Sequence, residues 1–68
     1  MSAAAAVHLL EARRLMTRAR EVLEQGRQAA KADSAPYAIE QAAEFAGADV
    51  GLAVTRINVA LRKLGAAP

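Results

Sequence analysis

The chain has 68 residues, carries a formal net charge of +2 and contains no cysteine. A chain this short forms at most one domain and buries about 60% of its unfolded surface, so it lies near the lower limit for stability without a partner. The absence of cysteine excludes disulfides and thiolate metal sites. Alanine is abundant and aromatic residues make up only 3% of the chain, which favours helices over strands. The preference for alanine and arginine suggests a bacterial or phage protein.

The first predicted element is a helix over about residues 3–32. Its apolar residues recur at alternating spacings of three and four, the heptad pattern of a coiled coil. They are Leu9, Ala12, Met16, Ala19, Leu23, Gly26 and Ala30. Glycine costs a helix interior about 1 kcal/mol relative to alanine, so Gly26 could instead cap a shorter helix. We expect the helix to continue, with Gly26 facing Ala43 and allowing the two backbones to approach closely.

A turn is predicted over residues 33–36, because Pro36 disfavours helical conformation at the residue before it. Asp33 or Ser34 would then cap the second helix, which we expect over about residues 36–64, with Gly65 at its end. The inward stripe of this second helix repeats the spacing of the first. It consists of Ile39, Ala43, Ala46, Val50, Ala53, Ile57, Ala60 and Leu64.

Counted outward from the turn, the two stripes place large residues opposite small ones. The pairs are Ala30 with Ile39, Leu23 with Ala46, Ala19 with Val50, Met16 with Ala53, Ala12 with Ile57, and Leu9 with Ala60. This mirror pattern predicts an all-α fold, an antiparallel two-helix hairpin with alanine-rich close packing that spans residues 1–68 as one unit. Such a hairpin has little area to bury, so we expect two copies to form a four-helix bundle.

A second apolar row lies on the second helix outside its inward stripe. Phe45, Leu52 and Val59 are seven residues apart and rotated from the stripe by more than about 100°, while Val54 and Leu61 widen the apolar surface on the other flank. We interpret the row as an oligomer or partner interface. It would serve self-association or a different protein; the alternative is scattered exposed residues, which are common on soluble proteins.

Charge placement favours an antiparallel dimer, because acidic residues occupy the first half of the second helix and basic residues the second half. A two-fold axis near Leu52 would bring Asp49 near Arg56 of the other copy and Phe45 opposite Val59. Parallel packing would place like charges together.

A row of basic residues on the first helix offers a possible nucleic-acid surface. Arg13, Arg20 and Arg27 are seven residues apart and Lys31 extends the row, so the cations would follow phosphates at intervals of about 10 Å. Against this reading, Glu24 is well placed to pair with two of the arginines, and no aromatic residues interleave to stack bases. A solvated helix face is the simpler interpretation.

Catalysis, metal binding and membrane insertion find little support in the sequence. His8 is the only histidine, and no hydroxyl residue has an adjacent base and acid, so we expect no catalytic, cofactor-binding or metal-binding residues. The most apolar window, residues 42–61, is interrupted by charged residues, which predicts no membrane span. No secretion signal is recognisable, so we expect a cytoplasmic protein.

The expected function follows from the surfaces that the hairpin leaves uncovered. We expect a non-enzymatic, homodimeric interaction protein that binds a larger protein and modulates or inhibits it. The first alternative is a nucleic-acid-binding regulator built as a four-helix dimer. The second is a structural oligomerisation subunit without a distinct target.

Overall fold

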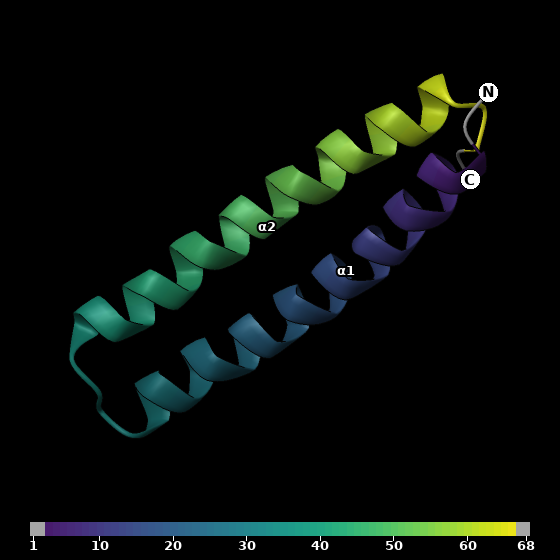
Figure 1. Ribbon diagram of the computed structural model, residues 1–68. Coiled ribbons are helices and arrows are strands. Elements are labelled where there is room, and N and C mark those ends of the chain that lie inside the picture. The colour runs from purple at the N-terminus through teal and green to yellow at the C-terminus, as the bar shows by residue number, and fades with distance from the viewer. Residues whose placement is uncertain (1–2, 67–68) are drawn as a thin grey trace.

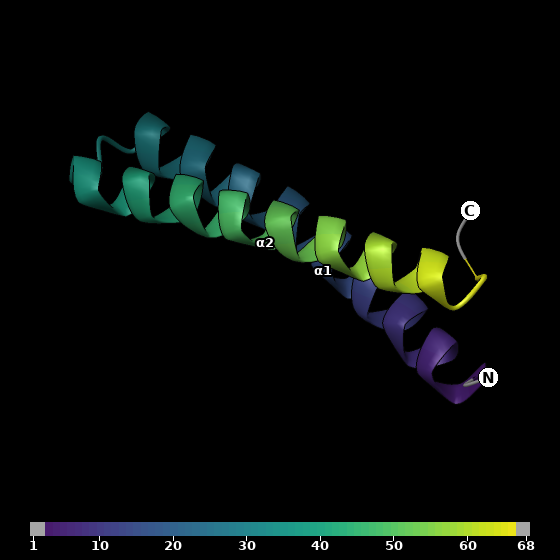
Figure 2. The same cartoon turned by 90° about the horizontal axis from the view of Figure 1, so that it is seen from above.

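The computed structural model describes residues 3–66, and this range contains two α-helices and no strand. Helix α1 (Ala3–Ala32) and helix α2 (Tyr37–Lys63) lie antiparallel (Figure 1). They cross at a shallow angle (Figure 2) and form a rod of 50 × 15 × 14 Å. The predicted all-helical hairpin is confirmed; positions 1, 2, 67 and 68 of the predicted unit lie outside the described residues.

Helix α1 passes through Gly26 without a break. The expected close approach of the backbones at this point is wrong, because a Cβ atom built on Gly26 or Gly47 would meet nothing within 4 Å. Gly47 lines an open depression between the helices, and Gly26 is exposed with open space around it.

Both helices end in the same hydrogen-bonded cap. After α1, the Ala35 N–H donates to the Ala30 carbonyl (2.9 Å) and the Ser34 N–H to the Lys31 carbonyl (3.2 Å), with Ser34 left-handed at φ 55°. After α2, the Ala66 N–H donates to the Leu61 carbonyl (2.9 Å). The Gly65 N–H donates the next hydrogen bond inward, and Gly65 is left-handed with φ 71°. This pair of bonds with one left-handed residue is the Schellman motif.

The predicted cap of the second helix is wrong. Its N-cap is Pro36, which makes no side-chain capping hydrogen bond, and α2 begins at Tyr37. Asp33 and Ser34 instead belong to the cap that closes α1, because the left-handed turn at Ser34 satisfies the last carbonyls of that helix.

The contact between the helices is narrow. The expected inward residues are mostly half-buried, and Leu61 is the only fully buried side chain within residues 3–66. Leu61 was expected on an outer flank together with Val54, and this placement is wrong for Leu61; Val54 is half-buried. The reason is that the face of α2 turned towards α1 also includes the seven-spaced row of Gly47, Val54 and Leu61.

Ile39 belongs to the predicted inward stripe, but its side chain is exposed. Its N–H donates to the Pro36 carbonyl (2.9 Å), which places it in the first turn of α2 at the very end of the rod. A side chain there has protein on only one side.

Candidate functional site

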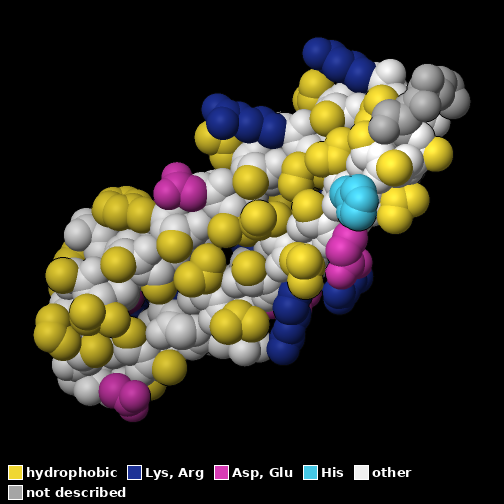
Figure 3. Space-filling model, in the orientation of Figure 1, with side chains coloured by type: hydrophobic (Ala, Val, Ile, Leu, Met, Phe, Trp, Pro, Cys, Tyr) yellow, Lys and Arg dark blue, Asp and Glu magenta, His cyan; other side chains and the backbone are white. Residues whose placement is uncertain are grey.

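The main feature of the surface is uncovered apolar area. In the part of the chain that the structure describes, nine large apolar side chains are at least 38% exposed, and hydrophobic side chains spread over both helices on the face shown in Figure 3. The accessible surface is 4925 Å² for a mass of 7.1 kDa. A compact monomer of this mass exposes about 4,100 Å², so the excess is about 800 Å², the area that one partner contributes to a standard interface.

The row of Phe45, Leu52 and Val59 is exposed along α2, with exposed fractions between 41% and 59%. At 100° per residue this row points almost directly away from α1, because the opposite side of α2 carries the half-buried and buried positions. Asp49 and Arg56 are exposed beside it, and within residues 3–66 neither forms an ion pair.

A second exposed apolar set belongs to α1 and was not singled out as a site by sequence reasoning. Leu15 and Val22, seven residues apart, are 53% and 48% exposed. Half-buried alanines lie next to them in the heptad pattern, among them Ala12 and Ala19. The signal was present in the sequence, since these residues form a heptad row that shares its alanines with the inward stripe.

The basic row of α1 lies along the line where the helices meet. The Arg13 guanidinium donates to Asn58 Oδ1 across the hairpin (2.8 Å). The Arg20 guanidinium lies over α2, so that a Cβ atom on Gly51 would be 3.4 Å from its Cζ.

The third arginine of the row, Arg27, lies between two carboxylates. It forms a bidentate ion pair with Glu24, with hydrogen bonds of 2.6 and 2.9 Å. Its Nη1 is also 3.6 Å from Glu40 Oε1 on α2. Lys31 is exposed in the last turn of α1. The three arginines thus face three points along α2, which sequence reasoning missed because it considered the row only as an outer surface.

The ion pairs also change the acidity of two glutamates. Hydrogen bonds from Arg27 and then from Gln28 lower the pKa of Glu24 to about 2, and Glu24 in turn raises the pKa of Arg27. On the outer side of α1, the hydrogen bond from Arg14 lowers the pKa of Glu11. Glu24 therefore stays charged well into the acidic range and neutralises part of the charge of the basic row.

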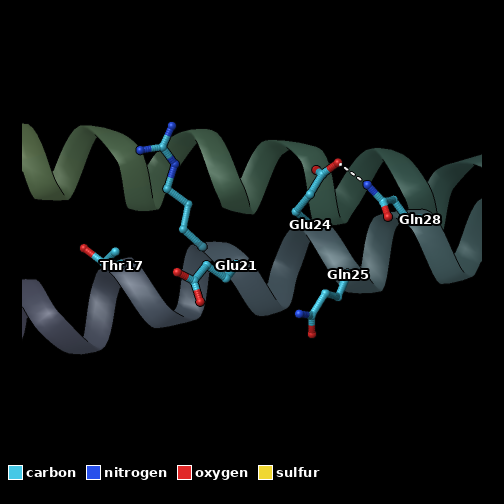
Figure 4. Close-up of a pocket in the computed structure, with 6 residues that line it drawn as sticks. Thr17, Glu21, Glu24, Gln25 and Gln28 are labelled. Atoms are coloured by element: carbon cyan, nitrogen blue, oxygen red, sulfur yellow. Dashed lines mark hydrogen bonds between the residues drawn. The ribbon is translucent and has the colours of Figure 1, made fainter.

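Depressions on the described surface include two that are open to solvent. One, of about 520 Å³, is lined by polar side chains of α1 that include Thr17, Glu21 and Gln28. Figure 4 shows Gln28 donating a hydrogen bond to Glu24 there, and Gln25 lines the same depression. The other, of about 320 Å³, lies between the helices above Ala43, Gly47 and Ala48. Neither combines an enclosed apolar wall with convergent polar groups, the usual form of a small-molecule site.

Residues with catalytic or ligand chemistry are dispersed. Within residues 3–66 no three His, Asp or Glu side chains gather as a metal would require. His8 is exposed and stands on α1 apart from any carboxylate cluster. Neither described helix combines the length and hydropathy needed to cross a membrane.

Comparisons with protein-family models, curated proteins and solved structures found no match.

Proposed function

We propose that this chain is a non-enzymatic interaction protein that acts as a homodimer and binds a larger protein, whose activity it modulates. The observation that carries the proposal is the uncovered apolar surface: among residues 3–66 one side chain is fully buried, whereas nine large apolar ones remain exposed. A folded chain with so little core is expected to gain its stability from a partner. The excess area supports a partner of protein size.

The contacts of the basic row support a protein partner over a nucleic acid. Arg13 and Arg27 are held by Asn58 and by two glutamates, so following phosphates would require these contacts to be given up. Of the row, Arg20 and Lys31 form no hydrogen bond or ion pair in the described part of the chain, and Arg20 lies over Gly51 of α2. A phosphate-binding surface needs several cations free to replace counterions.

The homodimer is tested by sedimentation equilibrium of the full chain over a wide concentration range. We expect a mass twice that of the monomer at the higher concentrations. A monomer at all concentrations, with unchanged helix content, would refute self-association.

Binding of a larger protein is tested by affinity capture from the native host with Phe45→Ser, using Arg18→Ser as the matched control on an exposed polar position. We expect one dominant protein to be retained by the parent and the control and lost with Phe45→Ser. The nucleic-acid alternative predicts instead a strongly salt-dependent capture that falls when the three arginines are changed to glutamine.

A further inference from the structure

The direction of the Phe45, Leu52 and Val59 row restricts what can be built on it. Because the row points away from α1, a second copy docked there would place α2 against α2, with both α1 helices on the outside. The product would be a single layer of four helices and not a bundle. It would also leave Leu15 and Val22 uncovered.

The flank of α1 that carries Leu15 and Val22 has the pattern of a second packing surface. Along this flank large and small residues alternate at spacings of three and four, as in the contact between α1 and α2. The residues are His8, Ala12, Leu15, Ala19, Val22 and Gly26. On the face of the molecule shown in Figure 3, hydrophobic side chains lie over both helices and most of the visible charged ones lie towards the margins.

This flank is complementary to itself in the antiparallel direction. If two copies of α1 meet with residue 17 at the two-fold axis, Leu15 lies opposite Ala19 of the second copy, and Val22 lies opposite Ala12. His8 then lies opposite Gly26. Every large side chain faces a small one, which is the requirement for close helix packing. By contrast, antiparallel pairing of the outward row sets Leu52 against Leu52.

The charges of α2 select the same axis independently. The contacts of Arg13 with Asn58 and of Arg20 with Gly51 show that residue 17 stands beside about residue 54 of α2. Asp49 and Arg56 of two antiparallel copies pair about a point between residues 52 and 53. The two centres differ by less than two residues, about 3 Å along a helix, which the flexible arginine side chain can span.

We propose that the second copy docks antiparallel on the flank of α1 that carries Leu15 and Val22, forming a two-layer four-helix bundle. The Phe45, Leu52 and Val59 row then stays on the outside of the bundle, where the larger protein binds. This assignment rests on the proposed homodimer and specifies which surface each partner uses. Asp49 and Arg56 fix the orientation of the copies, since such pairs select geometry more than affinity.

The test compares Leu15→Glu with the matched Leu52→Glu, because both leucines are about half exposed on helix surfaces. We expect Leu15→Glu to raise the dissociation constant of the dimer at least about tenfold, and Leu52→Glu to leave it unchanged. Circular dichroism checks that both variants remain helical. A dimer lost with Leu52→Glu, or retained with Leu15→Glu, would overturn the assignment.

A charge exchange provides a second, independent readout. Asp49→Arg should weaken the dimer by placing like charges together, and the double variant with Arg56→Asp should restore it. Failure of the double variant to restore a dimer that Asp49→Arg has weakened would contradict the proposed axis. A parent chain that is monomeric at every concentration would instead refute the proposed homodimer itself.

Discussion

The repeated cap gives the sharpest prediction about stability. Ser34 and Gly65 occupy the same position of the same motif, both with left-handed backbone. A non-glycine residue in that region carries a penalty of roughly 1–2 kcal/mol, whereas glycine loses about 0.5–1 kcal/mol more conformational entropy on folding. Ser34→Gly is therefore expected to stabilise the hairpin by about 0.5–1 kcal/mol.

The assay is thermal and urea unfolding followed by circular dichroism, with all variants at one protein concentration so that self-association contributes equally. For a chain of this size the gain corresponds to a rise in Tm of about 2–8 °C. Gly65→Ser is the matched reverse change and should lower the stability by a similar amount, because the backbone at φ 71° then carries a side chain.

Two results would refute this reasoning. The first is a Ser34→Gly variant that is less stable than the parent, which would mean that the hydroxyl of Ser34 contributes more than the backbone penalty. The second is a neutral Gly65→Ser variant, which would mean that the end of α2 is not held in the Schellman motif.

Further predictions concern the packing and the ion pairs. Leu61→Ala should lower the stability by about 2–4 kcal/mol, whereas Leu52→Ala should change the stability of the hairpin by less than about 0.5 kcal/mol; chemical unfolding measures both. Gly47→Ala should raise the stability by about 0.5–1 kcal/mol, since a Cβ atom on Gly47 meets nothing within 4 Å. A lower stability of this variant would show that the space beside Gly47 is occupied. Asn58→Ala should lower the stability by about 1 kcal/mol, measured by urea unfolding. The contribution of Glu24 should be complete above pH 4.5 and lost as the pH falls towards 2; Glu24→Gln should remove this part of the pH dependence of the urea midpoint.

The sequence was sufficient to predict that two helices pack antiparallel, because periodicity and the large-to-small pairing are properties of the chain alone. It was not sufficient to locate the centre of the contact on α2. That centre depends on how the side chains of both helices pack together, for example Arg20 of α1 over Gly51 of α2, and such contacts join residues far apart in the chain. Leu61 was placed wrongly for this reason.

The candidate surfaces were predicted to a similar extent. The outward row of Phe45, Leu52 and Val59 is exposed as expected, since its rotation from the inward stripe follows from helix geometry. Ser34 carried no signal of its left-handed conformation, because glycine or asparagine usually occupies that position. The flank of Leu15 and Val22 was not predicted as a separate surface, because these residues border the inward stripe and share its alanines.

Leu61 has a consequence for how the hairpin opens. It lies at the end of the rod farthest from the turn, where bringing the two helices together closes the longest loop of chain and so loses the most entropy. The turn end is held by covalent connection, and there Ile39 is exposed and the glycines border open space. The hairpin therefore has its best packing at the end where no turn joins the two helices. Amide exchange should show protection at Leu61, and the hairpin should not fray from that end.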